Sequence, residues 1–113
     1  MKYSARKIPP PRPPAGLSAE GRRWWKRIAE AWQLDAAAYL ILAGAMECFD
    51  RMRQAQGMIA TDGITISDRF GQIKQHPATM VERDAKSGLL RALKALNLDL
   101  EPLCERPGRQ PGR

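Results

Sequence analysis

The 113-residue sequence contains few of the residues on which catalytic and metal sites usually depend. It has one histidine and two cysteines. Cys48 and Cys104 form no CxxC pair and no disulfide framework, which favours a reducing cytosol. The single histidine, His76, has no nearby nucleophile and no second metal ligand at a recognisable spacing, so we expect it to cap a helix or lie in a loop. These absences predict a protein without a metal ion or other cofactor.

The sequence also lacks long apolar runs and phosphate-binding motifs. No apolar stretch approaches the roughly 18–20 residues of a membrane-spanning helix. The first cations are followed by prolines instead of the apolar region of a secretory signal. No glycine-rich loop followed by Lys and Ser or Thr is present, which argues against a Walker-type nucleotide site. Since the carboxylates are scattered as well, we expect a protein that is not an enzyme and does not bind a membrane.

Acidic residues are almost absent from the first quarter of the chain. Residues 1–27 contain eight cations and one anion, and their net charge of +7 equals that of the whole chain. Such a localised basic segment is typical of proteins that bind a polyanion, and we expect nucleic acid before membrane. A tail that only aids solubility is the alternative that composition leaves open. The predicted nucleic-acid-binding residues are Lys2, Arg6, Lys7, Arg12, Arg22, Arg23, Lys26 and Arg27.

Proline divides the chain into three parts. Residues 1–16 are rich in proline and cations, which predicts a flexible, extended arm. Residues 17–102 form the predicted helical domain for oligomerisation and DNA binding. Residues 103–113 have the composition of a short disordered tail.

The periodicity of the apolar residues predicts a mainly α fold with a three-helix core. The first helix is expected to begin after the N-cap Ser18. The second follows the cap Asp35 and is predicted to run from Ala36 to about Gln56. Gly57 then supplies the residue just beyond the helix end.

A short β-hairpin between the second and third helices completes the predicted fold. Asp62-Gly63 is the strongest short hairpin signal, because a type I′ turn requires positive φ at both central positions. Such a small hairpin is marginal in water, so it must dock on helices or on a neighbouring subunit. Pro77 is favourable at the first position of the third helix, which is predicted to run to about Leu96, with Asn97 as a left-handed stop.

The second helix is apolar on two faces. One face can pack on the other two helices, whereas the second has no obvious partner in so short a chain. Trp24 lies at the edge of the apolar stripe of the first helix. We therefore predict an interface between subunits, with a thicker core as the alternative. The predicted interface residues are Trp24, Ile41, Ala45, Cys48 and Met52.

Several segments, taken in order, carry a family resemblance. They are a Pro-rich leader, GLSAEGRRWWKRI, LDAAAYLILAGAMECF, a G…TDG segment, and HPATMVERDAKSGLLRALKALNL with a proline nearby. Together they resemble the small terminase subunits of tailed double-stranded-DNA bacteriophages, and most closely the compact three-helix subgroup. The resemblance covers about residues 9–102. The ending LNLDLEP departs from the more common Leu-Gly-Leu-Thr-Pro.

The resemblance implies a function. Such subunits form a ring-like homo-oligomer that recognises viral double-stranded DNA at the start of genome packaging. They also regulate a separate terminase large subunit, which carries the ATPase and nuclease. A phage-encoded protein of this kind is expected in the host cytoplasm. Two other functions stay open from the residues alone: a small DNA-binding transcriptional regulator, and a module whose PPPRPP segment docks in an aromatic groove of a protein partner.

Overall fold

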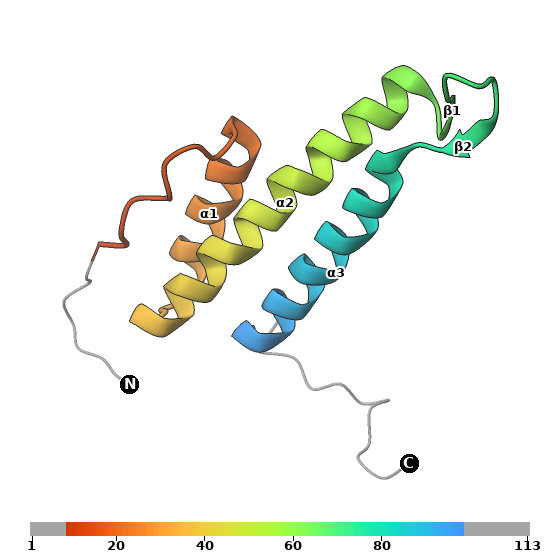
Figure 1. Cartoon of the computed structure of the whole chain (residues 1–113). Helices are drawn as coiled ribbons and strands as arrows, with labels where there is room; N and C mark the ends of the chain where they lie inside the picture. Colours follow the sequence, from red (N-terminus) through yellow and green to blue (C-terminus); the bar gives the residue numbers. More distant parts are fainter. Residues whose placement is uncertain (1–8, 99–113) are drawn as a thin grey trace, which may run out of the picture.

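The computed structural model describes residues 9–98, which form three helices and one small hairpin (Figure 1). The elements are, in order, α1 (Ala19–Ala31), α2 (Ala36–Asp62), β1 (Thr65–Ser67), β2 (Ile73–Gln75) and α3 (Pro77–Leu96). The predicted fold class, a three-helix core with a hairpin between the second and third helices, is confirmed. Within residues 9–98, no helix combines the length and the apolar character that crossing a membrane requires.

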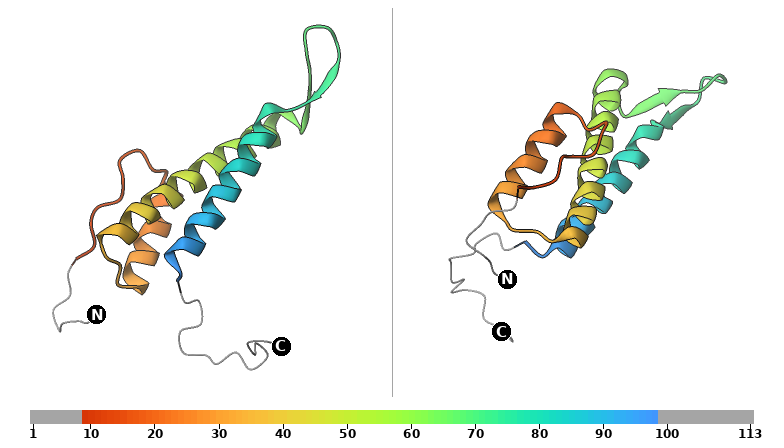
Figure 2. Two further views of the ribbon diagram at one scale, coloured as in Figure 1. Left: turned by 60° about the horizontal axis from the view of Figure 1, so that its bottom comes forward. Right: turned by 90° about the vertical axis from the view of Figure 1, so that its left-hand side faces the viewer.

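α2 is the central element of the bundle. α3 runs antiparallel beside it over most of its length, whereas α1 lies along only the N-terminal part of α2 (Figures 1 and 2). This difference follows from length, because α1 has 13 residues and α2 has 27. The hairpin projects from the end of the bundle where α2 stops and α3 starts. The last turns of α2 therefore pack on α3 but not on α1.

The core lies where the three helices meet. Leu42 and Ala45 are completely buried, and the rings of Trp25 and Tyr39 pack with centroids 5.5 Å apart. The buried cluster comprises Leu17, Trp25, Ile28, Leu42, Ala45, Met46, Phe49, Met52, Ala85 and Leu89. Since α3 contributes to this cluster, the second apolar face of α2 has a partner within the chain. The expectation that this face would lack one is wrong.

Two glycines allow the helices to approach one another closely. A Cβ atom built on Gly21 of α1 would lie 2.7 Å from Oδ1 of Asp50 on α2. A Cβ atom built on Gly88 of α3 would lie 2.9 Å from Sγ of Cys48 on α2. Both distances are shorter than a normal contact, so the packing of α2 on each neighbour depends on the missing side chain.

The helix starts agree with the predictions. Ser18 and Asp35 cap α1 and α2, and Pro77 is the first residue of α3. Asn97 ends α3 in the left-handed conformation, with φ of 54°. These limits are set by local chemistry: a side-chain oxygen that accepts from a free backbone N–H, or a residue suited to one backbone conformation.

A carboxylate from α2 fixes the start of α1. Asp50 accepts hydrogen bonds from the backbone N of Ser18 (2.7 Å) and from its Oγ (2.6 Å), while the same Oγ accepts from the N of Gly21 (2.9 Å). A negative group is favourable here because a helix N-terminus carries partial positive charge. The first turn of α1 is thereby attached to the middle of α2.

The predicted end of α2 and the predicted hairpin turn are both wrong. The helix continues through Gly57 to Asp62, and Gly63, with φ of 89°, is the residue that ends it. Asp62-Gly63 is therefore a helix end and not a hairpin turn. An interior glycine costs a helix only about 1 kcal/mol. Packing beside α3, where Ile59 is half-buried, offsets this cost.

The hairpin turn lies further along the chain, at residues 68–72. Oδ1 of Asp68 accepts from the N of Phe70 (2.8 Å) and the N of Gln72 (2.9 Å), and Gly71 has φ of 82°. The paired residues are Thr65 with Gln75, Ile66 with Lys74, and Ser67 with Ile73. Asp at the first position and Gly at the fourth are preferred in type I turns, so the segment DRFG carried the signal that was missed.

His76 connects the elements around the base of the hairpin. Its Nδ1 accepts from the N of Ala78 (2.9 Å) and so caps α3, which confirms the expected capping role. Because Nδ1 is the acceptor, Nε2 carries the proton and donates a hydrogen bond to Oδ2 of Asp62 (2.8 Å). The backbone N of His76 donates to the carbonyl of Ile64 (2.8 Å). With 6% of its surface exposed, this residue joins α2, the hairpin and α3.

Candidate nucleic-acid interface

The cations of α1 lie on the side of the helix that faces away from the core. At about 100° per residue, they fall within an arc of roughly 140°. Trp25 and Ile28, which are buried, occupy the opposite side. The four exposed cations, which we call the α1 basic face, are Arg22, Arg23, Lys26 and Arg27. The structure therefore brings together half of the predicted nucleic-acid-binding residues on one surface.

The charge of this face is largely uncompensated. Glu20, the acid of the first quarter of the chain, is paired with Arg53 of α2 at 3.3 Å. Among residues 9–98, none of the four cations lies within 4.0 Å of a carboxylate oxygen. Arg27 instead lies over the ring of Trp24, 5.2 Å from its centroid. Glu30, at the end of the same face, reduces its formal charge from +4 to +3.

The described part of the proline-rich arm contacts α1. The indole Nε1 of Trp25 donates a hydrogen bond to the carbonyl of Pro11 (3.2 Å). This contact places the backbone of exposed Arg12 close to the same helix. The remaining predicted cations, Lys2, Arg6 and Lys7, lie outside the described residues.

A chain of polar contacts aligns the three helices. Arg53 of α2 bonds Glu20 of α1, and its Nη1 also donates to Oε1 of Gln56 (2.8 Å). Nε2 of Gln56 then donates to Oε2 of Glu82 on α3 (3.0 Å). Exposed ion pairs contribute only about 0–1 kcal/mol each. Their effect here is chiefly on how the helices are aligned, and so on where the α1 basic face points.

The predicted interface residues fall into different environments. Trp24 is 40% exposed, whereas Ile41 and Cys48 are half-buried. Ala45 and Met52 belong to the core of the chain itself, so the structure does not present their side chains to a second subunit. The physical reason is that α3 covers this side of α2. The subunit contact through Trp24 stays a prediction.

Exposed apolar side chains gather instead at the hairpin end of the molecule. Ile64 is 64% exposed, and Phe70 and Ile73 are each 75% exposed. Ile73 is paired with Ser67, and Ile64, three residues before Ser67, therefore points to the other side of the ladder, while Phe70 lies in the turn. We call these three residues the hairpin surface. Sequence patterns did not single it out, because alternation within two three-residue strands cannot show whether another element covers them.

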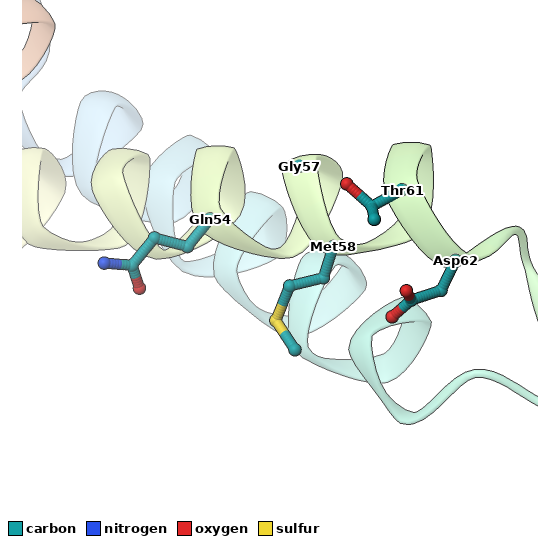
Figure 3. Close-up of a pocket in the computed structure, with 5 residues that line it drawn as sticks. All are labelled: Gln54, Gly57, Met58, Thr61 and Asp62. Carbon is teal, nitrogen blue, oxygen red and sulfur yellow. The ribbon is translucent and has the colours of Figure 1, made fainter.

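A shallow groove runs along one side of α2 near its C-terminal end (Figure 3). Its volume is about 510 Å³. The residues that line it are Gln54, Gly57, Met58, Thr61 and Asp62. Their spacing of three and four residues places them along one side of the helix. Met58, which is 53% exposed, supplies the apolar part of this α2 groove.

The described residues offer no cluster of metal ligands. Within residues 9–98, no group of three or more His, Cys, Asp or Glu side chains lies close enough to hold a metal ion. Both ring nitrogens of His76 are engaged in the hairpin base, and the Asp68 carboxylate is engaged in the turn.

Comparison with known proteins identifies the family of this three-helix subunit. The family model described as "Phage terminase, small subunit" matches residues 21–101, a span that includes the α1 basic face, the α2 groove and the hairpin. The chain belongs to the family of phage terminase small subunits, which acts in genome packaging and is in general the non-catalytic subunit. Neither a search of curated proteins nor a search of solved structures gave a match.

Proposed function

We propose that this chain is the DNA-recognition subunit of a phage packaging terminase. It binds viral double-stranded DNA, assembles into a ring-like homo-oligomer, and regulates the ATPase and nuclease of the terminase large subunit in the host cytoplasm, without catalytic activity of its own. The observation that carries the DNA-binding part is the α1 basic face. Four exposed cations on one face, without carboxylate partners among the described residues, are suited to a row of phosphates.

Contacts to DNA phosphates are the kind of binding that the small α1 basic face can provide. They release counterions and position the protein, but they do not read base sequence. Each subunit therefore binds DNA weakly and with little selectivity. A ring of several copies multiplies the basic surface, and the contacts then add through avidity. DNA binding therefore depends on the proposed oligomer.

Two structural observations favour this function over the alternatives left open by the sequence. A helix-turn-helix regulator must place its second helix in the major groove, whereas α2 packs on both α1 and α3. A proline-recognition module must leave its proline segment free for a partner, whereas Pro11 contacts this chain's own Trp25.

The DNA-binding part can be tested by removing charge from one helix at a time. The test variant replaces Arg22, Arg23, Lys26 and Arg27 with Gln. The matched control replaces Arg83, Lys86, Arg91 and Lys94, four exposed cations of α3, with Gln. Both variants lose four positive charges, so any difference between them reports position and not net charge.

The measurement is fluorescence anisotropy with a labelled duplex at several salt concentrations. Each phosphate contact contributes about −0.9 to the slope of log affinity against log salt, so losing four contacts should flatten it by roughly 3 to 4. We expect this change in the test variant, for any duplex sequence, and little change in the control. Equal effects in the two variants would show that the α1 basic face is not the DNA surface.

A test of the proposed regulation requires the cognate terminase large subunit. We expect the purified chain to alter ATP turnover by that subunit and to hydrolyse no ATP alone, because the sequence has no phosphate-binding loop. Hydrolysis by the chain alone that disappears when one of its own residues is substituted would contradict a non-catalytic role.

A further inference from the structure

The α2 groove contains a glycine that the fold of this chain does not require. Gly21 and Gly88 lie where neighbouring helices would collide with a Cβ atom, but a Cβ atom on Gly57 would meet nothing within 4 Å. Glycine inside a helix lowers its stability relative to alanine. Packing on α3 tolerates this loss, but no contact among residues 9–98 requires a glycine at position 57. Its missing side chain opens the α2 groove between Gln54, Met58 and Thr61 (Figure 3).

The hairpin surface is an apolar projection that no other element of residues 9–98 covers. Ile64, Phe70 and Ile73 are each at least 64% exposed. The turn is held by the carboxylate of Asp68 and the base by His76, so the shape is formed before any partner binds. An isolated two-stranded hairpin is marginal in water and is stabilised when its apolar side chains are buried.

The charges on these two surfaces are opposite. The hairpin carries Arg69, whose guanidinium lies 5.2 Å from the centroid of the Phe70 ring. It also carries Lys74, whose side chain is 59% exposed and whose Nζ lies 3.9 Å from Oδ2 of Asp68. The rim of the α2 groove carries Asp62, whose side chain is 48% exposed. The other nearby carboxylate, Asp68, is only 17% exposed and serves the turn.

We propose that the hairpin surface of one copy docks in the α2 groove of the next copy. Phe70 then packs on Gly57 and Met58, while Arg69 and Lys74 approach Asp62. In one chain the hairpin projects beyond the end of α2, so this contact forms between copies (Figure 2). Each copy contributes two different patches, and such a head-to-tail interface generates a ring when its rotation closes. The proposal rests on the proposed homo-oligomer and names the surfaces that build it.

A complementation experiment tests the pairing directly. Gly57→Arg fills the groove, and Phe70→Asp removes the apolar tip; both sites are exposed, so the fold should be retained, as circular dichroism can check. By light scattering, we expect each variant alone to be a monomer. An equimolar mixture should form a dimer and nothing larger, because only one intact hairpin and one intact groove remain.

Each other outcome of the mixing experiment contradicts one part of the proposal. If the two folded variants stay monomeric after mixing, the hairpin and the groove do not bind each other. If either variant alone keeps the wild-type mass, that surface is not in the interface. A monomeric wild-type chain contradicts the proposed oligomer itself, whereas a wild-type oligomer with unaffected variants contradicts only the docking.

A smaller substitution separates association from folding. Gly57→Ala should raise the thermal stability of the chain, because alanine favours the helix and the site is open, yet it should weaken association. Gly44→Ala is the matched control, since Gly44 is also open within α2 but lies outside the groove. The control should gain stability and keep its oligomeric mass. Equal weakening of association by both substitutions would refute a specific contact at Gly57.

Discussion

Adding one methyl group at Gly88 should strain the contact between α2 and α3. The new Cβ atom would lie 2.9 Å from Sγ of Cys48, whereas carbon contacts are optimal at about 3.5–4.0 Å. Overpacking of this kind typically costs about 1–3 kcal/mol. Alanine returns up to about 1 kcal/mol of helix propensity. The free energy of unfolding of Gly88→Ala should therefore fall by about 0–2 kcal/mol, which corresponds to a lower Tm by roughly 4–8 °C for each kcal/mol.

A double-mutant cycle distinguishes this collision from a general effect on α3. Cys48→Ala removes the sulfur that Gly88 faces, so Gly88→Ala should be neutral or stabilising by up to about 1 kcal/mol in that background. The coupling between the two sites should be about 1–3 kcal/mol. Urea unfolding at constant protein concentration, followed by tryptophan fluorescence, to which buried Trp25 contributes, measures all four chains. If Gly88→Ala has the same effect with cysteine and with alanine at position 48, the collision with Sγ does not occur.

Three further substitutions should each lower stability or change its pH dependence. His76→Ala removes the cap that accepts from the N of Ala78, and should lower the free energy of unfolding by about 0.5–2 kcal/mol; an unchanged urea midpoint would contradict this. Asp50→Ala leaves the N–H of Ser18 without its partner and should cost about 1–3 kcal/mol, whereas Asp50→Asn should cost less in the same assay. Burial raises the pKa of Tyr39 above 10.0, so the folded state holds this proton more tightly than the unfolded state, and stability should fall as the pH rises past 10; in thermal unfolding, Tyr39→Phe should show a smaller fall.

The helix starts could be predicted from sequence because they depend on neighbouring residues. Ser18, Asp35 and Pro77 each satisfy or replace a backbone donor within one turn, so the signal and the structure lie in the same short segment. The end of α2 could not be predicted in this way. Gly57 suits a helix end, but α3 packs beside the following turns and extends the helix to Asp62.

The candidate surfaces also differ in whether they depend on a single segment or on the packing of several elements. The α1 basic face follows from residue spacing on a single helix, so the sequence was sufficient to locate it. The hairpin surface and the α2 groove depend on which residues other elements leave uncovered. The exposure of Phe70 and the open space around Gly57 are properties of the folded chain and have no periodic signal in the sequence.

The position of His76 makes the base of the hairpin observable by NMR in 15N-labelled protein. It is the only histidine in the chain, so its imidazole should give one set of ring resonances free of overlap from other histidines. One ring nitrogen is tied to the start of α3 and the other to the end of α2. The nitrogen shifts distinguish the two tautomers, and they would therefore reveal whether the base of the hairpin stays closed when DNA or another subunit binds.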